Sequence, residues 1–276
     1  MNYQDRLRAH LVKYKFRSLG VLASGAWKGP RTGAVAAHPH ILPAGEARLN
    51  ILAPYRERFW QEFERGERRP LHRDFAHLNS SQAMCFNLFY PLVADRAWAS
   101  AFVQNVLGVK GTPRTLAFEY VEDPQESTHF DFFVQLDSAE KLYFETKLAE
   151  IGFGTAELDA RSRERLMRLY APRLAGLVDP KWLEPDAFFR RYQLLRNLAY
   201  LDQPGNLLYL VLPRANESLA QALRILPEIT AGALQERVRV LYLEDALERV
   251  KPLLRGRGEA LKNHYREFRE KYLPVE

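Results

Sequence analysis

Apolar residues follow two different spacings along the chain. Near the N-terminus, Leu7, Leu11 and Tyr14 recur at intervals of three or four residues, which is typical of one face of a helix. In the middle of the chain, short runs rich in aromatic and branched apolar residues are typical of strands. Because helical and strand-like segments alternate as far as the C-terminus, the pattern predicts an α/β protein.

The predicted elements can be placed by residue number. In chain order they are helices over 3–16, 49–65 and 80–107, strands over 115–121, 129–135 and 142–148, a helical region at 192–197, a strand over 206–213, a helix over 217–226, a strand over 238–243 and two final helices. A Gly-, Pro- and His-rich connection separates the first two helices, and the second is broken near Pro54.

Two of the predicted strands carry charged residues inside apolar runs. Asp131 lies between Phe130 and Phe132, while Glu145 and Lys147 are two positions apart and therefore share one face of their strand. A buried charge without a partner is costly or shifts its pKa, so charged side chains in such segments are expected to meet. We therefore expect Asp131, Glu145 and Lys147 to form one site.

Two carboxylates beside a lysine suit metal-assisted hydrolysis of a phosphodiester. Mg²⁺, or Mn²⁺ in its place, prefers oxygen ligands. Asp131, Glu145 and the backbone carbonyl of Thr146 would hold the ion, and the ammonium of Lys147 would orient the attacking water or hold it as hydroxide. The alternative is a cross-strand ion pair on a solvated sheet face, which would contribute about 0.2–1 kcal/mol.

The order of elements around these residues resembles the PD-(D/E)XK superfamily of restriction-endonuclease-like nucleases, whose core runs helix, three-strand meander, helix, strand. The resemblance covers about residues 75–215, and the segments 77–92 and 193–197 look like a bacterial branch of the superfamily. No proline precedes Asp131, where Phe130 stands, but this proline is commonly absent. The resemblance implies such a core, with an N-terminal helical and loop extension and an added C-terminal strand and helices.

Three further polar residues are accessory candidates. Gln82 lies on the helix that often carries a polar residue toward the metal in this superfamily, or else it forms a capping box with Asn79. Glu119 would be a further metal ligand or the partner of an arginine. Gln193 resembles a glutamine of exonuclease-like members, but those carry a tyrosine four residues later, where this chain has Asn197. The resemblance therefore favours an endonuclease.

Positive charge is concentrated at the N-terminus. Residues 1–45 contain seven Lys or Arg and one acidic residue, a net charge of +6 that equals the charge of all 276 residues. This segment, including Lys28 and Arg31, would contact nucleic-acid phosphates, or else it is an ordinary solvated surface. We expect a basic N-terminal extension, residues 1–75, packed on a nuclease-like domain, residues 76–276.

Four histidines form a competing candidate site. His38, His40, His72 and His77 have imidazoles that bind zinc where geometry allows, although the chain has no His-Glu-x-x-His helix. Hydrogen bonding within loops is the alternative, and spacing alone leaves metal binding open. The single cysteine, Cys85, excludes an intrachain disulfide and a thiolate zinc site and indicates a reducing compartment.

Two functions from different classes remain. The first is a Mg²⁺-dependent nuclease acting on DNA, or on RNA, through a metal-activated water. The second is a catalytically degenerate nucleic-acid-binding or structural subunit of a defence or repair complex. The sequence shows no signal peptide and no apolar stretch near the roughly 20 residues of a membrane helix, so we expect a cytoplasmic protein without membrane contact, as a monomer or homodimer.

Overall fold

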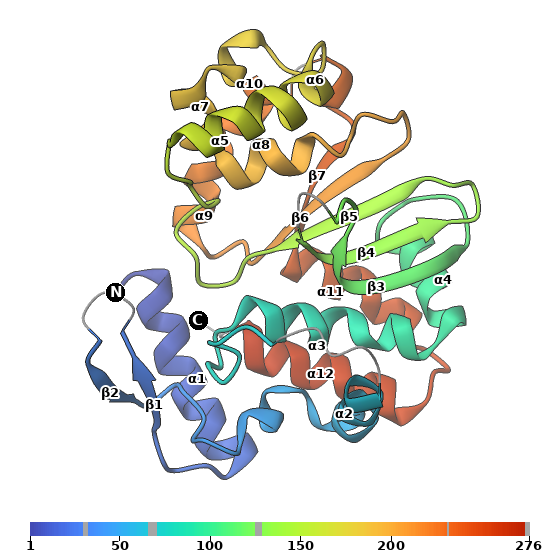
Figure 1. Ribbon diagram of the computed structural model, residues 1–276. Coiled ribbons are helices and arrows are strands. Elements are labelled where there is room, and N and C mark those ends of the chain that lie inside the picture. Colours follow the sequence, from blue (N-terminus) through green and yellow to red (C-terminus); the bar gives the residue numbers. More distant parts are fainter. Residues whose placement is uncertain (30–32, 66–70, 125–128, 231, 274–276) are drawn as a thin grey trace.

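The computed structural model describes residues 1–29, 33–65, 71–124, 129–230 and 232–273. Its centre is a five-stranded sheet in the order β3-β4-β5-β6-β7 (Figure 1). The first three strands are antiparallel neighbours, whereas β5, β6 and β7 are parallel. The strands are β3 (Pro113–Val121), β4 (His129–Leu136), β5 (Lys141–Thr146), β6 (Leu207–Leu212) and β7 (Val238–Tyr242).

One face of the sheet is covered by helices from both ends of the chain (Figure 1). Their apolar residues share one buried cluster with Phe132, Phe144 and Tyr209 of the sheet. Phe89 stacks on Phe132 with ring centroids 4.4 Å apart, and the free cysteine Cys85 is buried in the same cluster. The helices that contact the strands are α3 (Ser81–Ala94), α4 (Arg96–Asn105) and α11 (Leu243–Leu253), while α12 (Glu259–Tyr272) packs on α3, and α1 (Tyr3–Leu19) packs on α12.

The other face is covered by short helices from the middle of the chain. Their apolar residues cluster with Phe130, Tyr143 and Leu208. Tyr143 and Phe144 thus belong to opposite faces, as alternation along a strand requires. These helices are α5 (Ala160–Arg165), α6 (Ala171–Leu174), α7 (Pro185–Phe189), α8 (Tyr192–Leu198), α9 (Glu217–Ala222) and α10 (Leu226–Ile229), with a π-helical turn (Leu166–Tyr170) between α5 and α6.

The remaining elements lie in the N-terminal part or join the larger ones. They are strands β1 (Gly25–Lys28) and β2 (Val35–His38), helix α2 (Arg56–Arg65), and 3₁₀ helices Ala47–Asn50, Ala53–Tyr55, Pro180–Leu183, Leu223–Ile225 and Gly232–Leu234. Tyr3, Leu7 and Leu11 of α1 are buried with the helices of the first face. The division of the chain at residues 75 and 76 stays a prediction.

The mixed α/β architecture is confirmed, and each predicted strand has a counterpart in the sheet. The connection after α1 was wrongly expected to lack strands, because β1 and β2 form a hairpin there. The helix expected over 80–107 is two helices. Asp95 has extended backbone angles, φ −141° and ψ 110°, and its carboxylate accepts hydrogen bonds from the backbone of Ala97 and Trp98, so it ends α3 and caps α4.

Three element ends also differ from expectation. Ser80, rather than Asn79, caps α3 by accepting a hydrogen bond from the backbone N–H of Ala83. Strand β5 ends at Thr146, so Lys147 follows the strand instead of lying inside it. The break expected near Pro54 in the helix over 49–65 is confirmed, because Pro54 lies in a 3₁₀ helix, but the α-helix α2 begins at Arg56 and not at residue 49. Within the described ranges, no helix has the length and apolar character needed to cross a bilayer.

Candidate active site

Strands β4 and β5 separate at the position of Asp131. Their backbone register ends at the pair Phe132 and Phe144. One position further along, the carboxylate of Asp131 accepts hydrogen bonds from the backbone N–H of Thr146, at 2.6 Å, and from its hydroxyl, at 2.7 Å. A side chain therefore takes the place of the next backbone partner, and an opening forms at this end of the sheet.

Both carboxylate oxygens of Glu145 accept hydrogen bonds. The side chain is 2% exposed, and its Oε1 accepts hydrogen bonds from Gln193, at 2.7 Å, and from Lys147, at 2.9 Å. Its Oε2 accepts a hydrogen bond from Asn197 at 3.0 Å. Gln193 and Asn197 are one turn apart on α8 and so present their amides to the same carboxylate. Hydrogen bonds to a charged acceptor are strong, so Glu145 has one defined orientation.

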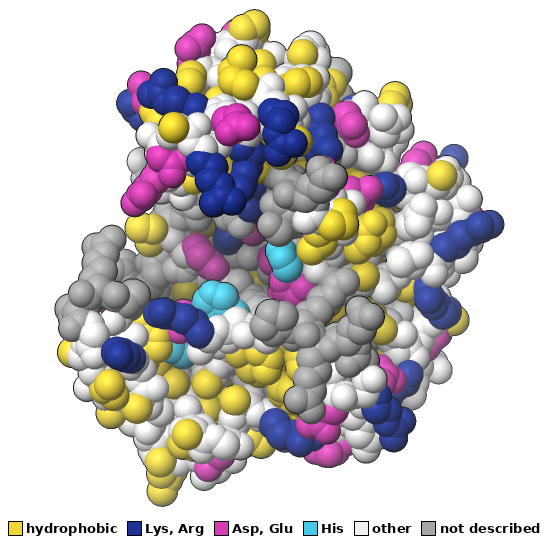
Figure 2. Space-filling view, viewed as in Figure 1, with side chains coloured by type: hydrophobic (Ala, Val, Ile, Leu, Met, Phe, Trp, Pro, Cys, Tyr) yellow, Lys and Arg dark blue, Asp and Glu magenta, His cyan; other side chains and the backbone are white. Residues whose placement is uncertain are grey.

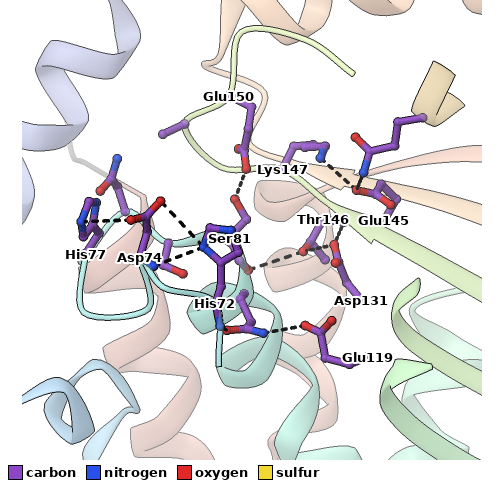
Figure 3. Close-up of a pocket in the computed structure, with 15 residues that line it drawn as sticks. His72, Asp74, His77, Ser81, Glu119, Asp131, Glu145, Thr146, Lys147 and Glu150 are labelled. Carbon is purple, nitrogen blue, oxygen red and sulfur yellow. Dashed lines mark hydrogen bonds and ion pairs between the residues drawn. The ribbon is translucent and has the colours of Figure 1, made fainter. Parts of the chain in front are cut away.

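All the residues expected at the catalytic centre line one cavity of about 510 Å³ (Figure 3). The structure brings Asp131, Glu145, Thr146 and Lys147 together there. It also places the three accessory candidates, Gln82, Glu119 and Gln193, in the wall of the same cavity. The cavity has further lining residues that the sequence did not single out as one site: His72, Asp74, His77, Asn79, Ser80, Ser81, Ala149 and Glu150.

More acidic than basic side chains line this cavity. Burial, together with the neighbouring Glu145 carboxylate, raises the pKa of Asp131 well above its usual range. Burial alone would lower the pKa of Lys147, but the carboxylates of Glu145, Glu150 and Asp131 outweigh it and raise that pKa. Lys147 therefore stays an ammonium at neutral pH, and the acids around it leave an excess of negative charge.

The donor set fits a hard divalent cation. The carboxylates of Asp131 and Glu145 are oxygen ligands, and the Thr146 carbonyl points toward β4 because the N–H and C=O of one strand residue point the same way. The described residues contain no group of three or more His, Cys, Asp or Glu side chains placed to hold a metal. The site thus matches ions that take one or two carboxylates and complete their shell with water and phosphate oxygens.

Gln82 and Glu119 are joined to each other across the cavity wall. The Gln82 amide donates a hydrogen bond to Glu119 at 2.8 Å, and its oxygen accepts one from the backbone N–H of His72 at 2.8 Å. The capping-box alternative for Gln82 is therefore wrong. Glu119 also lies 3.8 Å from Nδ1 of His129, and its φ of +48° is unusual for a residue with a side chain.

Glu150 is a residue of the cavity that spacing did not identify. One of its oxygens accepts a hydrogen bond from the hydroxyl of Ser81, and the other accepts the backbone N–H of Leu148 at 2.7 Å. Asn216 holds the same turn by donating to the carbonyls of Leu148, at 3.1 Å, and Glu150, at 3.0 Å. Ser81 and Asn216 come from distant parts of the chain, so no local pattern indicates their contacts with this turn.

The four histidines do not form one metal site. The rings of His38, His40 and His77 pack edge to face, with centroids 5.9 to 6.0 Å apart. Trp27 packs on His38 and His77. Burial lowers the pKa of His40 to about 4, which is consistent with a neutral ring in an aromatic cluster. His72 is not part of these ring pairs. It lines the cavity, as His77 also does, and the Nδ1 of His72 lies 3.8 Å from the carboxylate of Asp74.

The proposed phosphate contacts of the N-terminal segment lie apart from this cavity. Lys28 is exposed at the end of β1 and does not line the cavity. Arg31 lies outside the described residues. The hairpin is attached to the cavity wall through Trp27, whose indole N–H donates to the carboxylate of Asp74 at 2.8 Å.

Comparison with known proteins adds one match. A family model described as Restriction Endonuclease associating with ARP matches residues 8–273. No curated protein and no solved structure matches the chain. The match includes the cavity and both helical layers of the sheet. Because it covers nearly the whole sequence, the chain belongs to this family of restriction-endonuclease-like proteins.

Proposed function

We propose that this protein is a metal-dependent nuclease of the PD-(D/E)XK type that cuts DNA. The observation that carries the proposal is the meeting of Asp131, Glu145 and Lys147 in one cavity at the point where β4 and β5 separate. The restriction-endonuclease family supports a nuclease, and DNA rather than RNA, as the substrate class. The family's description also supports an endonuclease that works in association with a partner named ARP.

Each residue has a distinct part in the proposed reaction. Asp131, Glu145 and the Thr146 carbonyl would hold Mg²⁺ or Mn²⁺, and the bound ion would supply Lewis acidity toward water and phosphate. Lys147 keeps its proton at neutral pH, so it acts as a hydrogen-bond donor that orients water and stabilises charge developing on the phosphate. Gln193 and Asn197 are positioning residues, because they hold the Glu145 carboxylate in place.

A cleavage assay tests this proposal. Supercoiled plasmid, linear duplex, single-stranded DNA and RNA are incubated with the full chain in Mg²⁺, Mn²⁺ or EDTA. We expect metal-dependent cleavage of DNA, and a fall of about 10²-fold or more in Asp131→Asn, Glu145→Gln and Lys147→Ala. Glu57→Gln and Lys251→Ala change exposed residues of the same types on α2 and α11 and are expected to leave cleavage unchanged.

Two results would contradict the proposal. Undiminished cleavage by Asp131→Asn would place the activity outside this cavity. Binding of nucleic acid without cleavage of any substrate, with either metal, would instead support the degenerate binding or structural subunit.

A further inference from the structure

The segment that follows the active-site strand carries a dense group of arginines. Residues 160–174 contain five arginines and one acidic residue, Glu164. Figure 2 shows Lys and Arg side chains gathered over the part of the molecule that contains α5 and α6 in Figure 1, above the hollow in the middle of this face. Positive charge is therefore concentrated on the short helices beside the cavity as well as at the N-terminus.

Three of these arginines are available to a partner. Arg161, Arg163 and Arg168, here called the arginine surface, are exposed, and their guanidinium groups form no hydrogen bond or ion pair with any described residue. The backbone of this turn does bond to Asp159, and the charge of Arg161 helps to lower the pKa of that carboxyl. Arg173 differs, because its guanidinium bonds to Asp123 at 3.1 Å and lies 5.2 Å from the ring centre of Tyr200. Arg173 thus has a structural role, and the arginine surface has no such role within the described part of the chain.

The segment that carries the arginine surface packs against the sheet through buried apolar residues. Leu166, Tyr170 and Leu174 are fully buried at intervals of four residues and attach the segment to the sheet. Arg161, Arg163 and Arg168 are all exposed, so their side chains lie outside that buried face. The segment carries more positive than negative charge, which favours a polyanion as its ligand.

Hydrogen bonds between Gln193 and Gly154, followed by a short stretch of backbone, connect the active site to the arginine surface. Gln193, which holds Glu145, donates its backbone N–H to the carbonyl of Gly154 at 3.1 Å and accepts the N–H of Gly154 at 3.3 Å. Ala160, where α5 begins, is six positions after Gly154 in the chain, a reach of at most about 20 Å. That reach equals about six base pairs of duplex DNA.

We infer that the arginine surface binds the phosphate backbone of duplex DNA beside the cleavage site. The inference rests on the proposed function, since it assigns the substrate's flanking contact to these residues. Arginine suits this role because its planar guanidinium pairs with phosphate oxygens through two parallel hydrogen bonds. Contacts to phosphate position DNA without reading its sequence, so the proposed contact is independent of base sequence.

Equilibrium binding to a labelled duplex tests the inference. Fluorescence anisotropy of the full chain is measured in EDTA, where metal-dependent cleavage does not interfere, over about 50 to 200 mM salt. We expect the triple variant Arg161→Gln, Arg163→Gln, Arg168→Gln to flatten the slope of log K against log salt by about 2.7 units. The wild type would then lose about 40-fold more affinity than the variant across this salt range.

A control variant with the same change in charge isolates the position of the arginines. Lys251, Arg255 and Arg266 are exposed on or next to α11 and α12, which cover the opposite face of the sheet, and form no ion pair with described residues. Their triple replacement by Gln is expected to keep the wild-type slope. Replacing Arg161, Arg163 and Arg168 by Lys retains the charge, and is expected to keep most of the slope.

The outcomes separate this inference from the proposed function. Equal slopes for the arginine variant and the control variant, or no binding of duplex by the wild type, would overturn the inference even if the wild type cuts DNA. Arginine-dependent binding without any cleavage would sustain the inference and overturn the nuclease proposal. Thermal unfolding of each variant verifies folding. If the triple glutamine variant is unfolded, the single variants Arg161→Gln, Arg163→Gln and Arg168→Gln replace it, each expected to flatten the slope by about 0.9 unit.

Discussion

Asn197 contributes to the site without lining the cavity. Its amide donates to Oε2 of Glu145, and its own oxygen accepts hydrogen bonds from Arg196, so the side chain is fixed in orientation. Gln193 holds the other oxygen of the same carboxylate. Neighbours of this kind set the position of a metal-binding carboxylate and thereby influence how tightly it holds an ion.

Replacing Asn197 by Ala should therefore weaken metal binding. We expect about 10- to 100-fold more Mg²⁺ to be needed for half-maximal cleavage. The matched control is Asn206→Ala, because Asn206 is also buried but bonds to Lys141 and Tyr200 away from the cavity. Equal metal requirements for the two variants would mean that Asn197 acts only through stability.

Burial of the Asp131 carboxyl group lowers the stability of the metal-free protein. Its pKa is raised by burial and by Glu145, so the folded state favours the protonated form. This stabilising contribution is present below the ordinary Asp pKa of about 3.9 and is lost as pH rises through the raised pKa. Above the ordinary Asp pKa, burial of this group therefore disfavours folding unless a cation offsets its negative charge.

We accordingly expect Asp131→Asn to stabilise the metal-free protein at pH 7. A gain of about 1 kcal/mol would raise Tm by about 2–4 °C in a chain of this size. Mg²⁺ should raise the Tm of the wild type and have little effect on the variant. Asp186→Asn, which changes an exposed carboxylate on α7, is the control. A lower Tm for Asp131→Asn without metal would contradict this account.

At the scale of whole elements, the packing of α12 on α3 depends on a buried histidine. His264 of α12 is 1% exposed, and its Nε2 bonds to the backbone carbonyl of Asn87 in α3 at 2.6 Å. Burial lowers the pKa of His264 to about 4. The folded state therefore holds a neutral ring at a pH where an unfolded histidine, with a pKa of about 6.5, takes up a proton.

The contribution of His264 to stability should depend on pH in a defined way. It is present above pH 6.5 and is lost as pH falls toward 4, with a total loss of about 3 kcal/mol. We expect His264→Gln to be less stable than the wild type at pH 7, and this deficit to shrink by about 3 kcal/mol at pH 4. Urea unfolding at several pH values measures it, and a constant deficit would refute the assignment.

At the scale of the molecule, positive charge lies on two sides of the cavity. The arginine surface is beside α5, and Lys28 is on the β1–β2 hairpin, which Trp27 attaches to Asp74 in the cavity wall. Figure 1 shows these elements above and below the hollow seen in Figure 2. A duplex in contact with both would cross the catalytic residues.

The variant Lys28→Ala tests whether the β1–β2 hairpin contacts DNA phosphate. If Lys28 binds a phosphate, the variant should flatten the slope of log K against log salt by about 0.9 unit. Combining it with the arginine triple variant should add the two changes in slope, because the sites are independent. Lys251→Ala is the control. An unchanged slope in Lys28→Ala would mean that the hairpin is an ordinary solvated surface without a phosphate contact.

Local sequence was sufficient to predict the five strands of the central sheet and the positions of Asp131 and Glu145 on them, but not the β1–β2 hairpin or the end of β5 before Lys147. Alternation placed Glu145 on the face opposite Phe144, and the apolar run predicted a strand over 206–213, where the structure has the buried strand β6. Both predictions rest on the local pattern of apolar and polar side chains, which a few consecutive residues define. Asp95 shows the limit of this reasoning, because a helical pattern continued past it and its capping role was visible only in the backbone geometry.

Only the tertiary structure decided how the site is assembled. Gln193 meets Glu145 across 48 residues, and Ser81 meets Glu150 across 69. The carboxylate of Asp131 replaces a backbone partner of Thr146, which depends on where two strands stop pairing. Local periodicity describes which face a residue occupies. Distances between faces, and therefore hydrogen bonds, burial and pKa, follow only once the sheet and its helical layers have packed.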